Sequence, residues 1–183
     1  MKAIVLMLLL TVSALAQSPT SPTAACGPQN VTFKAIEADT PLDAAVPKDG
    51  KAIVYFIQDD GQRGDDQHYT VKMGLDGTWV GAYRDNAVFA IYVDPGEHHV
   101  CANVQSKFSL VGQLYSFAHF TAEAGKVYYI RSRFLGVIGH TSTSINLDQP
   151  DSDEAKYLIA TYPASISKPS DNSKPGPTPK AKR

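Results

Sequence analysis

The stretch from Ala87 to Gln105, AVFAIYVDPGEHHVCANVQ, constrains the fold more than any other part of this chain. Ala87–Val93 is a continuous apolar run with Val, Phe, Ile and Tyr, which is typical of a strand buried on both faces. Pro95 and Gly96 fit the centre of a type II turn, because proline presets φ at the first position and glycine accepts a positive φ at the second. The pattern therefore predicts a hairpin whose second strand spans residues 98–105.

The second strand alternates, so its side chains divide between two faces. One face carries His98, Val100, Ala102 and Val104, and the other carries His99, Cys101, Asn103 and Gln105. We therefore expect Cys101 to point away from the more apolar side of this strand.

Residues 1–16 have the pattern of a secretory signal peptide: Lys2, then an apolar run, then the small residues Ala14-Leu15-Ala16 before a cleavage site between Ala16 and Gln17. A membrane anchor is the alternative, but the apolar run is too short to span a bilayer. A lipoprotein anchored through Cys26 is a third interpretation, and the usual leucine is missing before that cysteine.

We expect an exported protein, periplasmic or secreted, without a transmembrane segment in the mature chain. Its formal net charge of −1 favours no nucleic-acid partner.

The chain has two cysteines, Cys26 and Cys101. An even pair in an exported chain predicts one disulfide, and two independent thiols are the alternative. The bond closes a loop of roughly 75 residues, for which the loop-entropy model gives on the order of 4 kcal/mol.

The pattern of the remaining residues predicts a single folded domain. Residues 17–25 are a Ser/Thr/Pro linker, and residues 26–163 contain short β-prone runs separated by turn signals, with Asp76-Gly77 as a two-residue hairpin turn. Residues 151–160 have helical spacing, with Asp151 or Ser152 as the cap. Residues 164–183 are rich in proline and lysine and predict a disordered basic tail. The fold class is all-β: an antiparallel β-sandwich of about seven to nine strands with one short C-terminal helix.

Several motifs in fixed order resemble the bacterial DUF2846 family of exported proteins and lipoproteins. They are KAIVYFIQDDG, LDGTWVGAY, VDPGEHHVCANVQS, AHFTAEAGKVYYIRSR and DSDEAKYLIATYP, within residues 51–163. The resemblance implies a small β-sandwich that attaches to a surface after export, and it brings no catalytic residues. The VDPGEHHV segment alone also resembles the hairpin of PEGA-type surface modules.

No catalytic or cofactor motif is present: the chain has no CxxC, HExxH, G-x-S-x-G or phosphate-binding glycine loop. His98 and His99 are adjacent in a strand, so they point to opposite faces. A metal site would need one of them to meet His119, with Glu97 or Glu123. The favoured interpretation is that His98 ends a core face and His99 is exposed, with no metal and no cofactor.

The aromatic residues of the strands predict core packing, whereas an exposed aromatic face would suit sugar or peptidoglycan binding. Trp79, after the Asp76-Gly77 turn, is the candidate for such a contact. Arg131 and Arg133 share a face and could pair with anionic ligand groups, although a polar edge is the simpler interpretation. The sequence thus favours a non-enzymatic envelope module that binds an unidentified envelope component or protein. A metal-dependent or other hydrolase on the same scaffold is the alternative.

Overall fold

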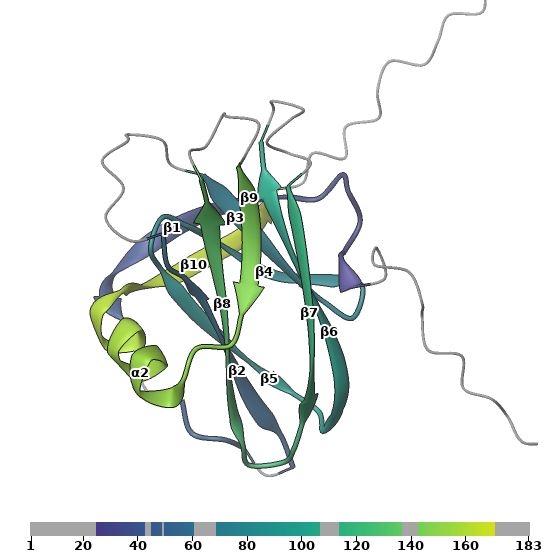
Figure 1. Cartoon of the computed structure of the whole chain (residues 1–183), viewed down its shortest axis with the longest axis vertical. Helices are drawn as coiled ribbons and strands as arrows, with labels where there is room; N and C mark the ends of the chain where they lie inside the picture. The colour runs from purple at the N-terminus through teal and green to yellow at the C-terminus, as the bar shows by residue number, and fades with distance from the viewer. Residues whose placement is uncertain are drawn as a thin grey trace, which may run out of the picture.

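A computed structural model describes residues 25–42, 45–48, 50–60, 69–106, 114–136 and 143–170. Two β-sheets pack face to face, and one helix lies against the outer face of the larger sheet (Figure 1). The predicted signal peptide, its cleavage site and most of the predicted linker lie outside the described residues. Within the described part of the chain, no helix is long and apolar enough to cross a membrane.

The larger sheet has six strands in the order β1, β10, β5, β2, β8, β9. Their bounds are β1 (Thr32–Pro41), β2 (Ala52–Gln58), β5 (Val88–Val93), β8 (Val127–Leu135), β9 (Ser144–Asp148) and β10 (Pro163–Ser170). The pairs β2–β8 and β10–β5 are parallel, and the other neighbours are antiparallel.

The smaller sheet is fully antiparallel, with the order β4, β3, β6, β7. Its bounds are β3 (Thr70–Leu75), β4 (Thr78–Arg84), β6 (Gly96–Gln105) and β7 (Tyr115–Ala122). The predicted all-β sandwich with one short helix is confirmed, with ten strands in the described residues instead of seven to nine.

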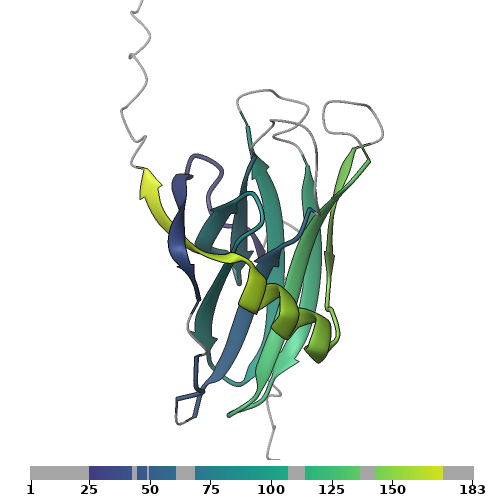
Figure 2. The same cartoon turned by 90° about the vertical axis from the view of Figure 1, so that its left-hand side faces the viewer.

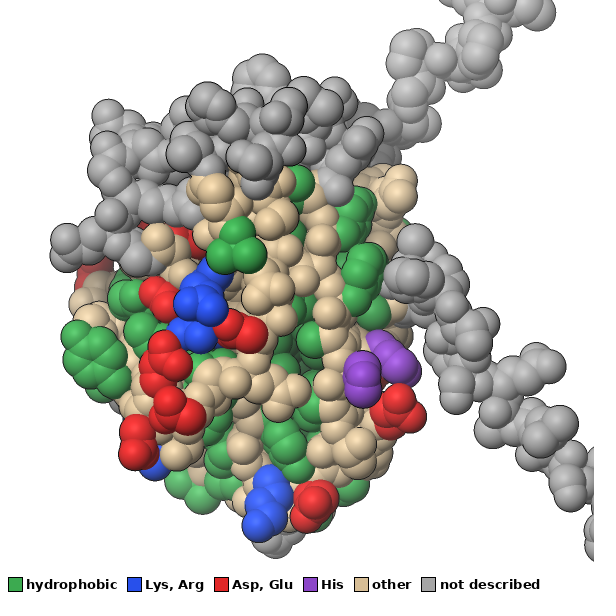
Figure 3. Space-filling view, in the orientation of Figure 1, with side chains coloured by type: hydrophobic (Ala, Val, Ile, Leu, Met, Phe, Trp, Pro, Cys, Tyr) green, Lys and Arg blue, Asp and Glu red, His purple; other side chains and the backbone are tan. Residues whose placement is uncertain are grey.

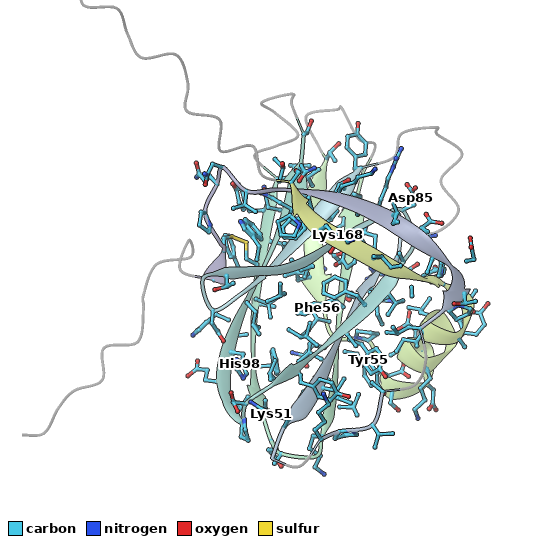
Figure 4. The ribbon with its side chains drawn as sticks, turned by 180° about the vertical axis from the view of Figure 1, so that it is seen from behind. Lys51, Tyr55, Phe56, Asp85, His98 and Lys168 are labelled. Atoms are coloured by element: carbon cyan, nitrogen blue, oxygen red, sulfur yellow. A yellow bond between two sulfur atoms is a disulfide. The ribbon has the colours of Figure 1, made fainter. Side chains whose placement is uncertain are left out.

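Strand β2 is the centre of the larger sheet, and all seven of its residues are buried. Its alternate side chains serve two cores. Phe56 belongs to the core between the sheets, and Tyr55 belongs to the cluster that helix α2 (Ser152–Thr161) covers. Figure 4 shows these two rings on opposite sides of the strand. The prediction of a central strand buried on both faces is therefore confirmed here.

The predicted hairpin around Pro95-Gly96 is wrong. Strand β5 pairs with β2 in the larger sheet, whereas β6 pairs with β3 and β7 in the smaller one. Gly96 does have the expected positive φ, at 140°, but the turn carries the chain from one sheet to the other. Tyr92 is 40% exposed, so burial on both faces also fails at the end of β5. Both runs have strong β-propensity, and propensity does not specify the partner strand.

The Asp76-Gly77 turn does form the predicted hairpin, between β3 and β4. The φ angles of Asp76 and Gly77 are 49° and 83°, as a type I′ turn requires at both central positions. Aspartate and glycine are among the residues that accept this conformation at the lowest cost.

The C-terminal boundary of the domain is also corrected. Residues 163–170 form β10, which pairs antiparallel with β1 from Thr32 to Pro41, so they do not begin the predicted tail. In Figure 2, β10 follows directly from the helix and crosses the front of the molecule. The hydroxyls of Ser165 and Ser167 bond the backbone of Ala82 in β4 at 2.8 and 3.0 Å. The polar, proline-containing residues 163–170 form a strand because β1 supplies hydrogen-bond partners for their backbone. Residues 171–183 of the predicted tail lie outside the described part of the chain.

Helix α2 begins where the sequence predicts. The Asp151 carboxylate accepts hydrogen bonds from the backbone N–H groups of Asp153 and Glu154 at 2.9 and 3.0 Å, which identifies Asp151 as the N-cap. The buried residues Ala155 and Leu158 then face the larger sheet.

Candidate functional site

The outer face of strands β6 and β7 carries the most unusual exposed side chains. We define the β6–β7 surface by Glu97, His99, Tyr115, Phe117 and His119. Antiparallel register places His99 opposite His119. In Figure 3, two histidine side chains lie next to each other on this side of the molecule, with an acidic side chain beside them.

Two aromatic rings occupy one end of this surface. Tyr115 is 37% exposed and Phe117 is 44% exposed, and their ring planes are parallel within 3°, with centroids 6.2 Å apart. Phe56 and Tyr83, by contrast, are fully buried in the core between the sheets. Tyr115 and Phe117 are exposed because side chains alternate along β7. Phe120 and Ala122 face the core, so the odd-numbered residues face solvent.

The two histidines occupy the other end. The ring centroids of His99 and His119 are 6.3 Å apart. The carboxylate placed against this pair is Glu97, whose Oε1 lies 3.7 Å from His99 Nε2. The structure thus brings together the histidine pair that the sequence suggested. Within the described ranges, no group of three or more His, Cys, Asp or Glu side chains is arranged to hold a metal ion.

His98 points the other way and has a structural role. Its Nδ1 lies 2.6 Å from Asp76 Oδ2 and its Nε2 lies 2.8 Å from the carbonyl oxygen of Asp94. Both partners are hydrogen-bond acceptors, so this geometry fits an imidazolium that donates from both nitrogens. Burial disfavours the charged ring, but the hydrogen bonds and charges of Asp94 and Asp76 outweigh it and raise the pKa of His98.

The protonated His98 should make stability depend on pH. Because the folded-state pKa lies above the unfolded value of about 6.5, its contribution is complete below that pH and is lost as pH rises through the folded pKa. We expect His98→Asn to lower the free energy of unfolding by roughly 1 kcal/mol at pH 5.5 and by less at pH 8.5. Urea unfolding of both proteins at the two pH values measures this. An equal loss at both would contradict an imidazolium.

Asp76 is a residue whose role the sequence reasoning missed. Besides its contact with the His98 ring, Asp76 forms two hydrogen bonds with the backbone of His99. Asp76 Oδ1 accepts from His99 N at 2.8 Å, and the backbone N–H of Asp76 donates to His99 O at 3.0 Å. The turn signal located Asp76 at a hairpin, but its contact with β6 depends on the pairing of β3 with β6.

Trp79 is engaged within the fold. It is only partly exposed, and its Nε1 donates to Pro28 O at 2.8 Å. Lys72 Nζ lies 4.2 Å from the centre of the Trp79 ring and donates to Val31 O at 3.1 Å. These contacts hold residues 25–31, which we call the N-terminal strap, across the smaller sheet. Trp79 therefore packs against the chain itself.

The predicted disulfide is present and fastens the same strap. Cys26 is bonded to Cys101, with the Cα atoms 5.2 Å apart. Cys101 is fully buried on the face of β6 opposite Val100 and Ala102, as the alternation predicted. Gly74 makes room for the strap, because a Cβ there would lie 2.7 Å from Ala25 O.

Arg131 lies in a buried ionic network. Its Nε and Nη2 donate to the two oxygens of Asp148 at 2.8 and 3.1 Å, and its Nη1 donates to Glu154 of helix α2. Arg133, partly exposed, donates to the same Asp148 at 2.6 Å. Asp59 lies 3.5 Å from Arg131 Nη1. Both arginines therefore pair within the protein, and the network joins β8, β9 and α2.

A hollow of about 350 Å³ lies between the larger sheet and α2. Its walls include Leu42, Tyr55, Val127, Tyr129 and Ile159, with Lys156 at one side. Tyr55 Oη already accepts a hydrogen bond from the backbone of Ala45. Few polar groups line it to orient a ligand, so the β6–β7 surface is the stronger candidate.

The fold and its cross-link define a disulfide-linked β-sandwich domain. No family model, no curated protein and no solved structure matches the chain. The resemblance to DUF2846 domains stays a prediction that rests on the sequence motifs.

Proposed function

We propose that this chain is an exported, non-enzymatic binding module of the bacterial cell envelope. In this proposal the β6–β7 surface contacts a carbohydrate-bearing envelope component such as peptidoglycan. The proposal includes membership of the DUF2846 family, for which the ordered motifs of residues 51–163 are the support.

The observation that carries the proposal is the exposed pair Tyr115 and Phe117. Two parallel rings on one sheet face offer apolar area that sugar rings can stack against, with little conformational entropy to lose. The two rings lie beside His99 and His119, which add hydrogen-bonding groups to the same face.

Export is supported by two independent features. Residues 1–16 have the charge and hydropathy pattern of a signal peptide. The Cys26–Cys101 bond is of the type that persists in oxidising compartments.

Cosedimentation with purified peptidoglycan tests this proposal. We expect the double variant Tyr115→Thr, Phe117→Thr to bind at least tenfold more weakly, while threonine preserves the β-propensity of the strand. Tyr157→Gln is the matched control, because Tyr157 is 67% exposed on helix α2, away from this surface. Equal binding by the double variant and the wild type would refute the role of the aromatic pair.

A chain that ends at Ser170 separates the domain from its basic C-terminal segment while keeping β10 intact. If the proposal is correct, this shortened chain keeps most of its binding at high salt. Binding that is lost on shortening, or that high salt removes, would assign recognition to the basic segment instead.

A further inference from the structure

We propose that His99 and His119 form a binding site for a divalent late transition-metal ion, with Zn²⁺ or Cu²⁺ as the preferred ions. The site does not include Tyr115 or Phe117, so it does not rest on the proposed carbohydrate contact. Imidazole nitrogens are ligands that these ions favour over Mg²⁺ or Ca²⁺.

The hydrogen bonds of the backbone bring the two side chains close. The N–H and C=O of His99 both bond Asp76, on the side of β6 away from β7. His99 and His119 are therefore a non-hydrogen-bonded cross-strand pair. In such a pair the Cα atoms are about 4.5 Å apart and the side chains are closer than in the hydrogen-bonded type.

The ring positions are within reach of a shared ion. With a metal–nitrogen bond of about 2.0 Å, an ion lies roughly 3 Å from each ring centre, so two rings on one tetrahedral ion have centres about 5 Å apart. The observed separation is 6.3 Å. Rotation of the exposed His119 side chain and of the partly exposed His99 side chain would close this difference.

Glu97 makes the site more favourable for a cation. It lies on the same face of β6, two residues before His99, and its carboxylate is 3.7 Å from His99 Nε2. A carboxylate beside two imidazoles adds a negative charge that attracts the cation, and water completes the coordination around the two imidazole nitrogens. His98 cannot take part, because it lies on the opposite face and both of its nitrogens are engaged.

Isothermal titration of the full oxidised chain with Zn²⁺ tests the site. We expect saturable binding of one ion at pH 7.5. His99→Gln and His119→Gln should each weaken binding at least tenfold. The double variant should lose little more than either single one, because one change already destroys the chelate. Glu97→Gln should have a smaller effect.

His68→Gln and His140→Gln are the matched controls, because they remove histidines that are not part of the proposed pair. Electron paramagnetic resonance with Cu²⁺ gives a second measurement: two coupled nitrogens in the wild type, and one in either single variant. Circular dichroism confirms that the variants fold. Wild-type protein that binds no Zn²⁺, or wild-type affinity in His99→Gln and His119→Gln, would overturn the proposal.

Discussion

Loss of the Cys26–Cys101 disulfide is expected to lower the free energy of unfolding by about 4 kcal/mol. The bond spans 75 residues, so its removal restores much conformational entropy to the unfolded chain. It also frees the N-terminal strap, whose remaining contacts to the smaller sheet are the hydrogen bonds from Lys72 and Trp79 and the packing of Val31 and Gly27. Urea unfolding of the oxidised chain, the reduced chain and the Cys26→Ala, Cys101→Ala double variant measures the effect.

Trp79→Phe provides the control for this measurement. It removes the hydrogen bond to Pro28 O but keeps the cross-link, so we expect a loss of roughly 1 kcal/mol. Reduced and oxidised proteins with equal urea midpoints would show that the cross-link does not contribute to stability.

Arg131→Met is expected to cost about 3 kcal/mol. The substitution retains the aliphatic length but leaves Asp148, Asp59 and Glu154 without the cation that joins them. Breaking a buried ion pair by removing one partner typically costs 3–5 kcal/mol, and partial exposure of the carboxylates places this case at the lower end. Urea unfolding at pH 7 measures the loss. Arg133→Met is the control, with about 1 kcal/mol or less expected because Arg133 is partly exposed.

The cost of Arg131→Met should also depend on pH. Partial burial raises the pKa of Asp148, but the hydrogen bonds and charges of Arg131 and Arg133 outweigh it and hold this pKa below its ordinary value. A depressed pKa contributes stability above the unfolded value of about 4, and this contribution is lost as pH falls through the folded value. The difference between wild type and variant should therefore shrink below pH 4. A difference that grows on acidification would contradict this assignment of charge.

The sequence alone determined the features that depend on near neighbours along the chain. Apolar runs located β2 and β5, alternation placed Cys101 away from Val100, and the Asp76-Gly77 pair specified a type I′ hairpin. Asp151 identified the start of the helix. Each of these follows from side-chain periodicity or from the φ preference of one or two residues, which are local properties. The two cysteines predicted their own bond because the chain contains no others.

Only the tertiary structure decided which strands are neighbours. A strand's backbone groups can pair with any other strand, so β-propensity could not show that β5 and β6 belong to different sheets. Residues 163–170 have the composition of a tail, and β1, more than 120 residues earlier, makes them a strand. The same non-local pairing places His99 opposite His119 and encloses Arg131 in carboxylates from other elements. The candidate site is therefore a product of strand register, which residues far apart in the chain set together.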